Sequence, residues 1–269
     1  MVAKKKKSFD KYIYYENSVQ SPEHHAEWFG RIFHEVTDRT AHSWREDFCG
    51  TAAMSVEWVK LHPKNTAIGI DLDPEPLEYH TRNHLPKLKP EVRKRIQLLN
   101  KNVLDVHQPK VDLITACNFS YCIFKERALL IRYLKGVCRS LKKGGIAILD
   151  LAGGPGMIAP MRERKTLRSK ETGKFKYVWH QRSFDPITHN AQYSIHFQLS
   201  DGEWKKDAFT YDWRLWTIPE VRECMKEAGF KNTCVYWETS HKGEGTGEYI
   251  RTESGDNAFA WVAYIVGQI

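Results

Sequence analysis

Short apolar runs alternate with amphipathic segments through the first 151 residues. The runs have the length of buried strands, and the segments between them repeat apolar residues at helical spacing. Strands that alternate with helices form parallel sheets with right-handed crossovers. The pattern therefore predicts an α/β fold with a doubly wound, mainly parallel sheet. Strands are expected at 42–48, 67–71, 96–99, 111–116 and 146–151, and helices at 52–61, 74–84 and 125–141.

An aromatic segment and a helix precede this unit. Ser21 as N-cap and Pro22 at the first helical position predict a helix that runs to about residue 37. Residues 9–20 before it are rich in aromatic side chains. Such a segment can pack as an arm, cover a pocket as a flap, or do both.

After residue 151 the pattern changes to strands joined by turns. A loop at 153–156 and a basic helix at 157–167 are expected to lead into three strands, at 176–184, 191–199 and 204–213. The turn residues between them predict a small antiparallel β insertion. We expect an N-terminal arm and helix (1–38), a core domain (39–156 and 217–269) and an inserted roof (157–216).

The core resumes with a helix and a terminal antiparallel pair of strands. Thr217 as N-cap and Glu220 three residues later predict a helix that ends at Gly229. Strands are expected at 233–238 and 258–266, with a Gly- and Glu-rich loop between them.

The composition is that of a globular protein with a basic surface. A hydrophobic content of 41%, with nine Trp and twelve Tyr, can supply a core. No run reaches the roughly 18 apolar residues that span a bilayer, and no apolar segment follows Lys4–Lys7. We expect a cytoplasmic protein with no membrane partner. The net charge of +8 fits either nucleic-acid binding or scattered solubilising charge.

Cysteine and histidine spacing gives no metal site. The six cysteines include no Cys-x-x-Cys pair, so we expect reduced, mostly buried thiols. His80 and His84 are spaced i, i+4 but have no acid between them, which favours a solvated helix face.

Polar residues stand at the end of every predicted parallel strand. Ligands of doubly wound sheets bind outside the carboxyl ends of the strands, so this set predicts a site there. Its members are Glu46, Asp47, Asp71, Asp73, Asn102, Asn118 and Asp150.

Over about residues 40–266 the chain resembles the class I S-adenosylmethionine-dependent methyltransferases. The resemblance implies a Rossmann-like fold, enzymatic activity and S-adenosyl-L-methionine as cofactor. Six motifs of that family occur in order: Glu46–Ala52 as the glycine-rich motif, Asp71 as the ribose-binding acid, Asn102–Asp105 as the adenine segment, then Cys117–Tyr121, Leu141–Asp150 and Glu220–Phe230.

The first motif departs from the family, because Phe48 and Ala52 occupy two of its three glycine positions. The turn must therefore be made differently. Glu46 is assigned to the methionine ammonium group, with an ion pair to Arg45 as the alternative, and Asp73 is expected to cap the following helix. The cofactor contacts that the resemblance implies are Glu46, Gly50, Asp71, Leu72, Asn102, Val103 and Asn118.

The insertion resembles the roof of small-molecule enzymes of the glycine N-methyltransferase type. Arg214 lies among aromatic residues and suits a carboxylate or phosphate. Tyr121 and Arg214 are candidates for orienting the substrate, and His196 or His180 for a general base; either histidine can equally be structural.

The leading hypothesis is in-line methyl transfer to a small polar, anionic molecule in a covered pocket. One alternative is an RNA methyltransferase that uses the basic surface. Another is a non-catalytic S-adenosylmethionine-binding or regulatory protein, in keeping with the lost glycines.

Overall fold

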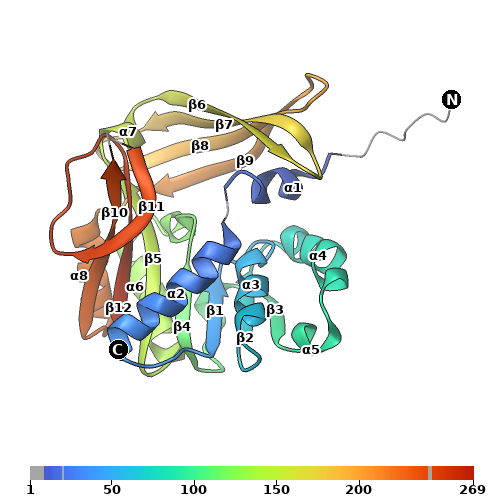
Figure 1. The fold of residues 1–269 in the computed structure, drawn as a ribbon. Helices are drawn as coiled ribbons and strands as arrows, with labels where there is room; N and C mark the ends of the chain where they lie inside the picture. Colours follow the sequence, from blue (N-terminus) through green and yellow to red (C-terminus); the bar gives the residue numbers. More distant parts are fainter. Residues whose placement is uncertain (1–8, 20, 242–243) are drawn as a thin grey trace.

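The computed structural model describes residues 9–19, 21–241 and 244–269. Within these residues the chain forms an eight-stranded sheet and a separate four-stranded antiparallel sheet (Figure 1). The large sheet has the order β11-β10-β12-β5-β4-β1-β2-β3. Its strands are β1 (Ser43–Asp47), β2 (Thr66–Asp71), β3 (Ile96–Asn100), β4 (Val111–Ala116), β5 (Leu141–Gly153), β10 (Asn232–His241), β11 (Glu244–Thr252) and β12 (Trp261–Gln268).

The predicted doubly wound sheet is confirmed. The strands β1 to β5 are parallel, and β12, β10 and β11 continue the sheet as antiparallel strands. The strand order reverses between β1 and β4, which is where ligands of such sheets bind.

Helices cover both faces of the large sheet. The helices α2 (Pro22–Thr37) and α3 (Ala53–Leu61) pack together on one face, and α6 (Arg127–Ser140) and α8 (Ile218–Ala228) on the other. Their buried positions recur at helical spacing, as in Phe29, Ile32 and Phe33 of α2. The smaller elements are α1 (Lys11–Glu16), α4 (Pro74–Asn83), α5 (Pro90–Arg93), α7 (Pro155–Ile158) and the 3₁₀ turns η1 (Leu85–Lys87), η2 (Val103–Asp105) and η3 (Ser120–Ile123).

The four-stranded sheet and α1 lie together, above the large sheet in Figure 1. The small sheet has strands β6 (Met161–Ser169), β7 (Gly173–Phe184), β8 (Asn190–Gln198) and β9 (Trp204–Arg214). Phe175, Tyr177 and Phe197 form its core, and Tyr14 and Tyr15 of α1 pack against them. The aromatic segment is thus a packed arm.

Two sequence-based expectations are wrong. A basic helix was expected at 157–167, but α7 ends at Ile158 and β6 pairs with β7 from Met161 onward. A loop was expected at 239–256, but β11 pairs with β10 there. Both β6 and β11 are edge strands, so their mostly exposed side chains carry no apolar alternation that could reveal them.

The remaining general expectations concern cysteines, metals and membranes. The six cysteines are free thiols, five of them buried. Among the described residues no group of His, Cys, Asp and Glu is arranged to hold a metal ion. None of the helices in this part of the chain is long and apolar enough to cross a membrane. Lys4–Lys7 lie outside the described residues.

Candidate cofactor and acceptor site

A cavity of about 440 Å³ lies where the carboxyl ends of β1, β2 and β4 meet. The small sheet and α1 close its other side. It is lined by Tyr12, Tyr15, Phe48, Cys49, Gly50, Thr51, Asp71, Asp73, Pro76, Asn118, Ser120, Ile123, Phe209, Thr210, Tyr211 and Trp213.

Asp71 is held rigidly at the end of β2. Its carboxylate accepts hydrogen bonds from the backbone N–H groups of Gly50, at 2.7 Å, and Asp73, at 2.9 Å. Burial raises the pKa of this carboxyl above its usual range. Asp73 caps α4 through the N–H of Glu75 at 2.9 Å, as expected from the sequence. The strand end thus presents one fixed carboxylate to the cavity.

The turn after β1 has left-handed backbone at one glycine and at two non-glycine residues. Phe48, Gly50 and Ala52 have φ angles of 57°, 53° and 54°. Side chains at Phe48 and Ala52 therefore take up the conformation that glycine would adopt without cost. Ala52 is fully buried, so packing holds the turn in this shape. The two replaced glycines change the energy of the turn and leave its left-handed geometry in place.

A second left-handed turn follows β4. Asn118 and Phe119 have φ angles of 56° and 58°. Their N–H groups both donate to the carboxylate of Asp150, at 2.6 and 2.9 Å. Burial raises the pKa of Asp150 to about 7, although these two hydrogen bonds oppose the rise. Asp150 thus fixes the turn that brings Asn118 to the cavity wall.

Glu46 lies behind the cavity wall. Its Oε2 accepts from the N–H of Ser55 at 3.1 Å and from the Ser55 hydroxyl at 2.5 Å. Burial raises the pKa of Glu46 to about 7. The ion pair considered as its alternative role is not formed, because Arg45 instead pairs with Asp47 at 2.7 Å.

The remaining cofactor candidates also lie off the cavity wall. Leu72 follows Asp71 and is 67% exposed. The side-chain oxygen of Asn102 accepts from the N–H of Leu104 at 3.0 Å, and Val103 is buried in the core. Of the seven candidates, Gly50, Asp71 and Asn118 are brought together at the cavity.

A second cavity of about 420 Å³ adjoins the first. Tyr15, Asn118, Tyr211 and Trp213 line both, so the two share one wall. The second cavity carries the charged residues Glu163, Lys165 and Glu238. Its other lining residues are Ser18, Val19, Phe119, Ala152, Met157, Tyr177, Trp179, Ile195, Ala260, Trp261 and Val262.

Helix α1 covers both cavities and is tied to the core. Glu16 accepts from the hydroxyl of Thr51 at 2.5 Å and lies 2.7 Å from Nε2 of His84. At the other end of α1, Lys11 pairs with Glu75 at 2.6 Å. The aromatic segment is therefore both arm and flap.

His80 corrects another expectation from the sequence. It was predicted to lie on a solvated helix face together with His84. Instead it is fully buried, with Nδ1 2.8 Å from the carbonyl of Thr51. Burial lowers its pKa. The reason is that α4 packs this face against the turn after β1, while His84 turns to Glu16.

Arg214 is engaged away from both cavities. Its guanidinium donates to Glu220 and to the carbonyl of Lys125, both at 3.0 Å, and stacks on Trp216 with 3.8 Å to the ring centroid. Glu220 is also the capping-box residue of α8. The structure thus gives Arg214 a carboxylate partner within the chain.

Tyr121 and His196 are likewise absent from the walls of both cavities. Tyr121 is fully buried in the main core, and its hydroxyl has no hydrogen-bond partner among the described residues. His196 lies 3.2 Å from His180 and accepts from the N–H of Asp207 at 2.8 Å. Its neighbours in β8, Ile195 and Phe197, point into the small sheet's core, so His196 faces the opposite side.

Several wall residues were not singled out from the sequence as site residues. Tyr211 and Trp213 are two positions apart on β9, so strand alternation places them on one face, but this pattern fits the small sheet's own core equally well. Glu163 and Lys165 come from β6, whose residues were read as a helix. Period-2 alternation in β9 was the available signal for the aromatic wall; nothing comparable marked β6.

Comparisons with known proteins agree with the observed fold. Residues 49–147 match the family described as "Methyltransferase domain". No curated protein sequence matches the chain. Its fold is similar to that of DesVI from Streptomyces venezuelae, with 16% identity, a TM-score of 0.71, and coverage of 97% of this chain and 98% of that one.

Two further structures have the same fold. The amino pentose methyltransferase CalS10 from Micromonospora echinaspora, solved with S-adenosylmethionine bound, is 15% identical with a TM-score of 0.70, covering 99% of this chain and 100% of that one. The sugar N-methyltransferase KedS8 from Streptoalloteichus is 16% identical with a TM-score of 0.66, covering 100% and 96%. Residues 49–147 thus match a methyltransferase domain, and the chain as a whole shares the fold of these methyltransferases.

Proposed function

We propose that this methyltransferase acts on a small polar molecule that carries an amino group. The observation that supports this most directly is the pair of adjoining cavities under one roof. The first has the volume of a cofactor site, since small-molecule pockets span about 300–1,000 Å³. It offers the Asp71 carboxylate for hydroxyl groups and aromatic walls for a flat ring. When bound there, S-adenosylmethionine supplies an electrophilic methyl group.

We call the first cavity the cofactor cavity and the second the acceptor cavity. The charged residues of the acceptor cavity favour a basic ligand group over an acidic one. Glu163 and Glu238 bring two carboxylates to it, and Lys165 brings one ammonium group, which lies 3.0 Å from Glu163. The expectation of an anionic acceptor rested on Arg214, which already has Glu220 as its partner. A carboxylate can hold an ammonium group and take up the proton that a reacting amine must lose.

The shared wall is where the two ligands meet. Tyr15, Asn118, Tyr211 and Trp213 are fixed by helix, turn and strand, so they can hold an acceptor close and aligned. Two of the structural neighbours are described as an amino pentose methyltransferase and a sugar N-methyltransferase. These descriptions support an amino sugar as the acceptor class.

The cofactor part is tested by calorimetric titration with S-adenosylhomocysteine. Asp71→Asn is expected to weaken binding about 10- to 100-fold, since hydrogen bonds to a charged group contribute about 1.5–3 kcal/mol. Asp73→Asn is the matched control: asparagine caps a helix as well as aspartate does, so affinity should change less than threefold. Absence of binding by the unaltered protein would remove the enzyme assignment.

The acceptor part is tested by mass spectrometry of reaction mixtures that contain S-adenosylmethionine. Amino sugars and their hydroxyl counterparts are compared, with transfer RNA as a further acceptor. Methylation of the amino sugars alone is expected. Methylation of RNA, or of the hydroxyl compounds in preference, would contradict the proposal.

A further inference from the structure

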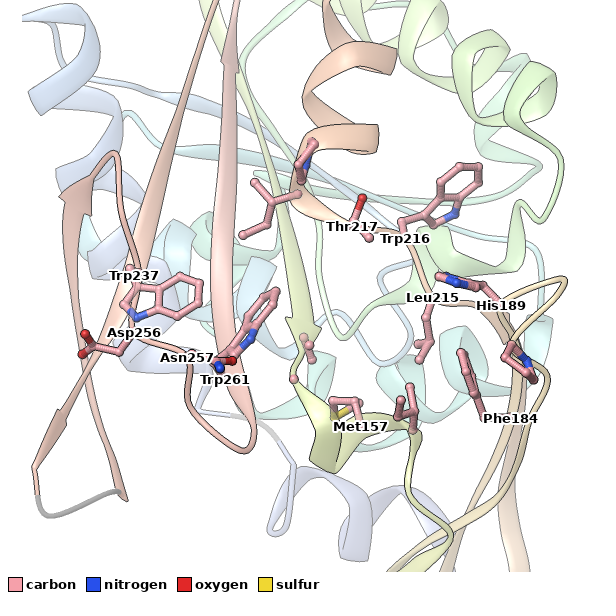
Figure 2. Close-up of a pocket in the computed structure, with 18 residues that line it drawn as sticks. Met157, Phe184, His189, Leu215, Trp216, Thr217, Trp237, Asp256, Asn257 and Trp261 are labelled. Atoms are coloured by element: carbon pink, nitrogen blue, oxygen red, sulfur yellow. The ribbon is translucent and has the colours of Figure 1, made fainter.

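A third cavity, larger than the cofactor and acceptor cavities, lies beside them (Figure 2). Its volume is about 670 Å³, and we call it the apolar chamber. It is bounded by the end of β5 and α7, the β7–β8 turn, the β9–α8 connection, β10, and the segment before β12. Its lining residues are Ala152, Gly153, Gly154, Met157, Ile158, Phe184, Pro186, His189, Leu215, Trp216, Thr217, Ile218, Pro219, Trp237, Gly255, Asp256, Asn257 and Trp261.

Two tryptophans form one wall. The ring centroids of Trp237 and Trp261 are 4.8 Å apart. Glycines support each ring from the side: a Cβ on Gly153 would come within 2.2 Å of Trp261, and a Cβ on Gly255 within 2.7 Å of Trp237. No larger residue fits these two positions beside the rings. The two rings are inclined to each other by 38°, and the glycines beside them leave this aromatic wall preformed for a ligand.

The opposite side is mostly apolar, with His189 and Thr217 as its polar members. Figure 2 shows Leu215 and Phe184 across from the two tryptophans, with Met157 between the sides. Neither lysine nor arginine lines the chamber among the described residues. The side chain of Asp256 points away from the two tryptophan rings in Figure 2. These walls suit an uncharged aromatic or aliphatic group, and they offer no lysine or arginine to a phosphate or carboxylate.

The apolar chamber adjoins the acceptor cavity. Ala152, Met157 and Trp261 line both, so these residues form a wall that the two cavities share. The backbone of Met157 is anchored, since its carbonyl accepts from the Tyr193 hydroxyl at 2.9 Å. Its side chain is unbranched and can change rotamer at little cost. Met157 is thus the flexible member of the wall between the acceptor cavity, which carries charged residues, and the apolar chamber.

We propose that the apolar chamber receives an uncharged apolar arm of the acceptor, whose amino-bearing end lies in the acceptor cavity. This inference rests on the proposed function. It implies an amphipathic acceptor, larger than an unsubstituted amino sugar. Burying such an arm removes apolar area from water, which strengthens binding without adding polar contacts.

The probes are the 2-naphthyl and methyl glycosides of glucosamine, and 2-naphthol alone. Binding is measured by calorimetry on protein saturated with S-adenosylhomocysteine. The naphthyl glycoside is expected to bind at least tenfold more tightly than the methyl glycoside. Ile158→Trp should remove this gain in affinity and leave the affinity for the methyl glycoside unchanged. Ile158 lines the chamber and is 43% exposed, so the larger side chain can fill the chamber without displacing core atoms. The matched control is Ile187→Trp, because Ile187 is 92% exposed in a turn and lines none of the three cavities. This variant should still bind the naphthyl glycoside at least tenfold more tightly than the methyl glycoside.

Equal affinity of the two glycosides, or a gain that survives Ile158→Trp, would overturn the assignment of the chamber. If S-adenosylhomocysteine binds and neither glycoside does, the proposed acceptor class is wrong. The binding of 2-naphthol then tests whether the chamber is an apolar binding site. Binding of 2-naphthol that Ile158→Trp abolishes supports the apolar site, and absence of such binding refutes it. Naphthol binding without any gain for the naphthyl glycoside shows a separate site, which refutes the acceptor arm.

Discussion

Neutralising Asp150 should flatten the dependence of stability on pH. This buried carboxyl holds the left-handed turn at Asn118 and Phe119, and burial raises its pKa from 3.8 to about 7. Below pH 3.8 it is protonated in both the folded and the unfolded chain. Between these two values the unfolded chain loses the proton first. The folded state then binds more protons, and the free energy of unfolding falls as pH rises. The loss is complete about one pH unit above the folded-state pKa of about 7.

The magnitude follows from the two pKa values. Their difference of about 3.2, at 1.36 kcal/mol for each pH unit, gives a total loss of about 4 kcal/mol for Asp150 from well below pH 3.8 to well above pH 7. Glu46 adds a loss of the same sign: its pKa rises from 4.5 to about 7, which corresponds to about 3 kcal/mol. Asp150→Asn should therefore remove the larger share of the slope, and Asp150→Asn with Glu46→Gln most of it.

The assay is urea unfolding of the ligand-free protein at pH values from 4.5 to 8.5. The quantity compared is the difference in unfolding free energy between the unaltered protein and each variant. For Asp150→Asn this difference in unfolding free energy should change with pH. If it stays constant within about 0.5 kcal/mol over this range, the reasoning is refuted, whatever the sign of the difference at pH 7.

Three further predictions concern stability and are read from urea midpoints at pH 7.5. Arg45→Met is expected to cost about 3–5 kcal/mol, because it leaves the buried Asp47 carboxylate with the Tyr133 hydroxyl as donor but without its ion-pair partner; adding Asp47→Leu should restore most of the loss, and a further loss would contradict this account. Gly50→Ala should cost about 1–2 kcal/mol through its φ of 53° alone, since its Cβ would meet nothing within 4 Å. Gly69→Ala should cost more, since its Cβ would lie 2.8 Å from a leucine methyl and 2.9 Å from a cysteine sulfur; equal costs would argue against this distinction. Thr217→Ala should cost about 1 kcal/mol by removing the capping box of α8, and no change would show that the cap is dispensable.

The fold and one part of the site follow from local patterns in the sequence. Buried parallel strands show as apolar runs, and the polar residue at each strand end marks the ligand edge. Asp71 and Asn118 were found in this way. Leu72 was not separable from Asp71, because neighbouring positions at a strand end point to opposite sides, and here only the first faces the cavity.

The acceptor side depends on contacts that no local pattern carries. Glu163 and Lys165 reach the cavity only because β6 pairs with β7 at the edge of the small sheet. Arg214 has the surroundings expected of an anion site, yet Glu220, placed there by the start of α8, already neutralises it. In each case a partner brought close by tertiary structure decides the role.

The covering helix α1 has a consequence for the rate of turnover. Tyr15 belongs to the walls of both the cofactor and the acceptor cavity, and the helix is fastened at each end, by Lys11 to Glu75 and by Glu16 to Thr51 and His84. Departure of the spent cofactor and of the methylated product is therefore coupled to the release of a single short element. We expect steady-state turnover to follow the opening rate of α1 rather than the rate of bond formation.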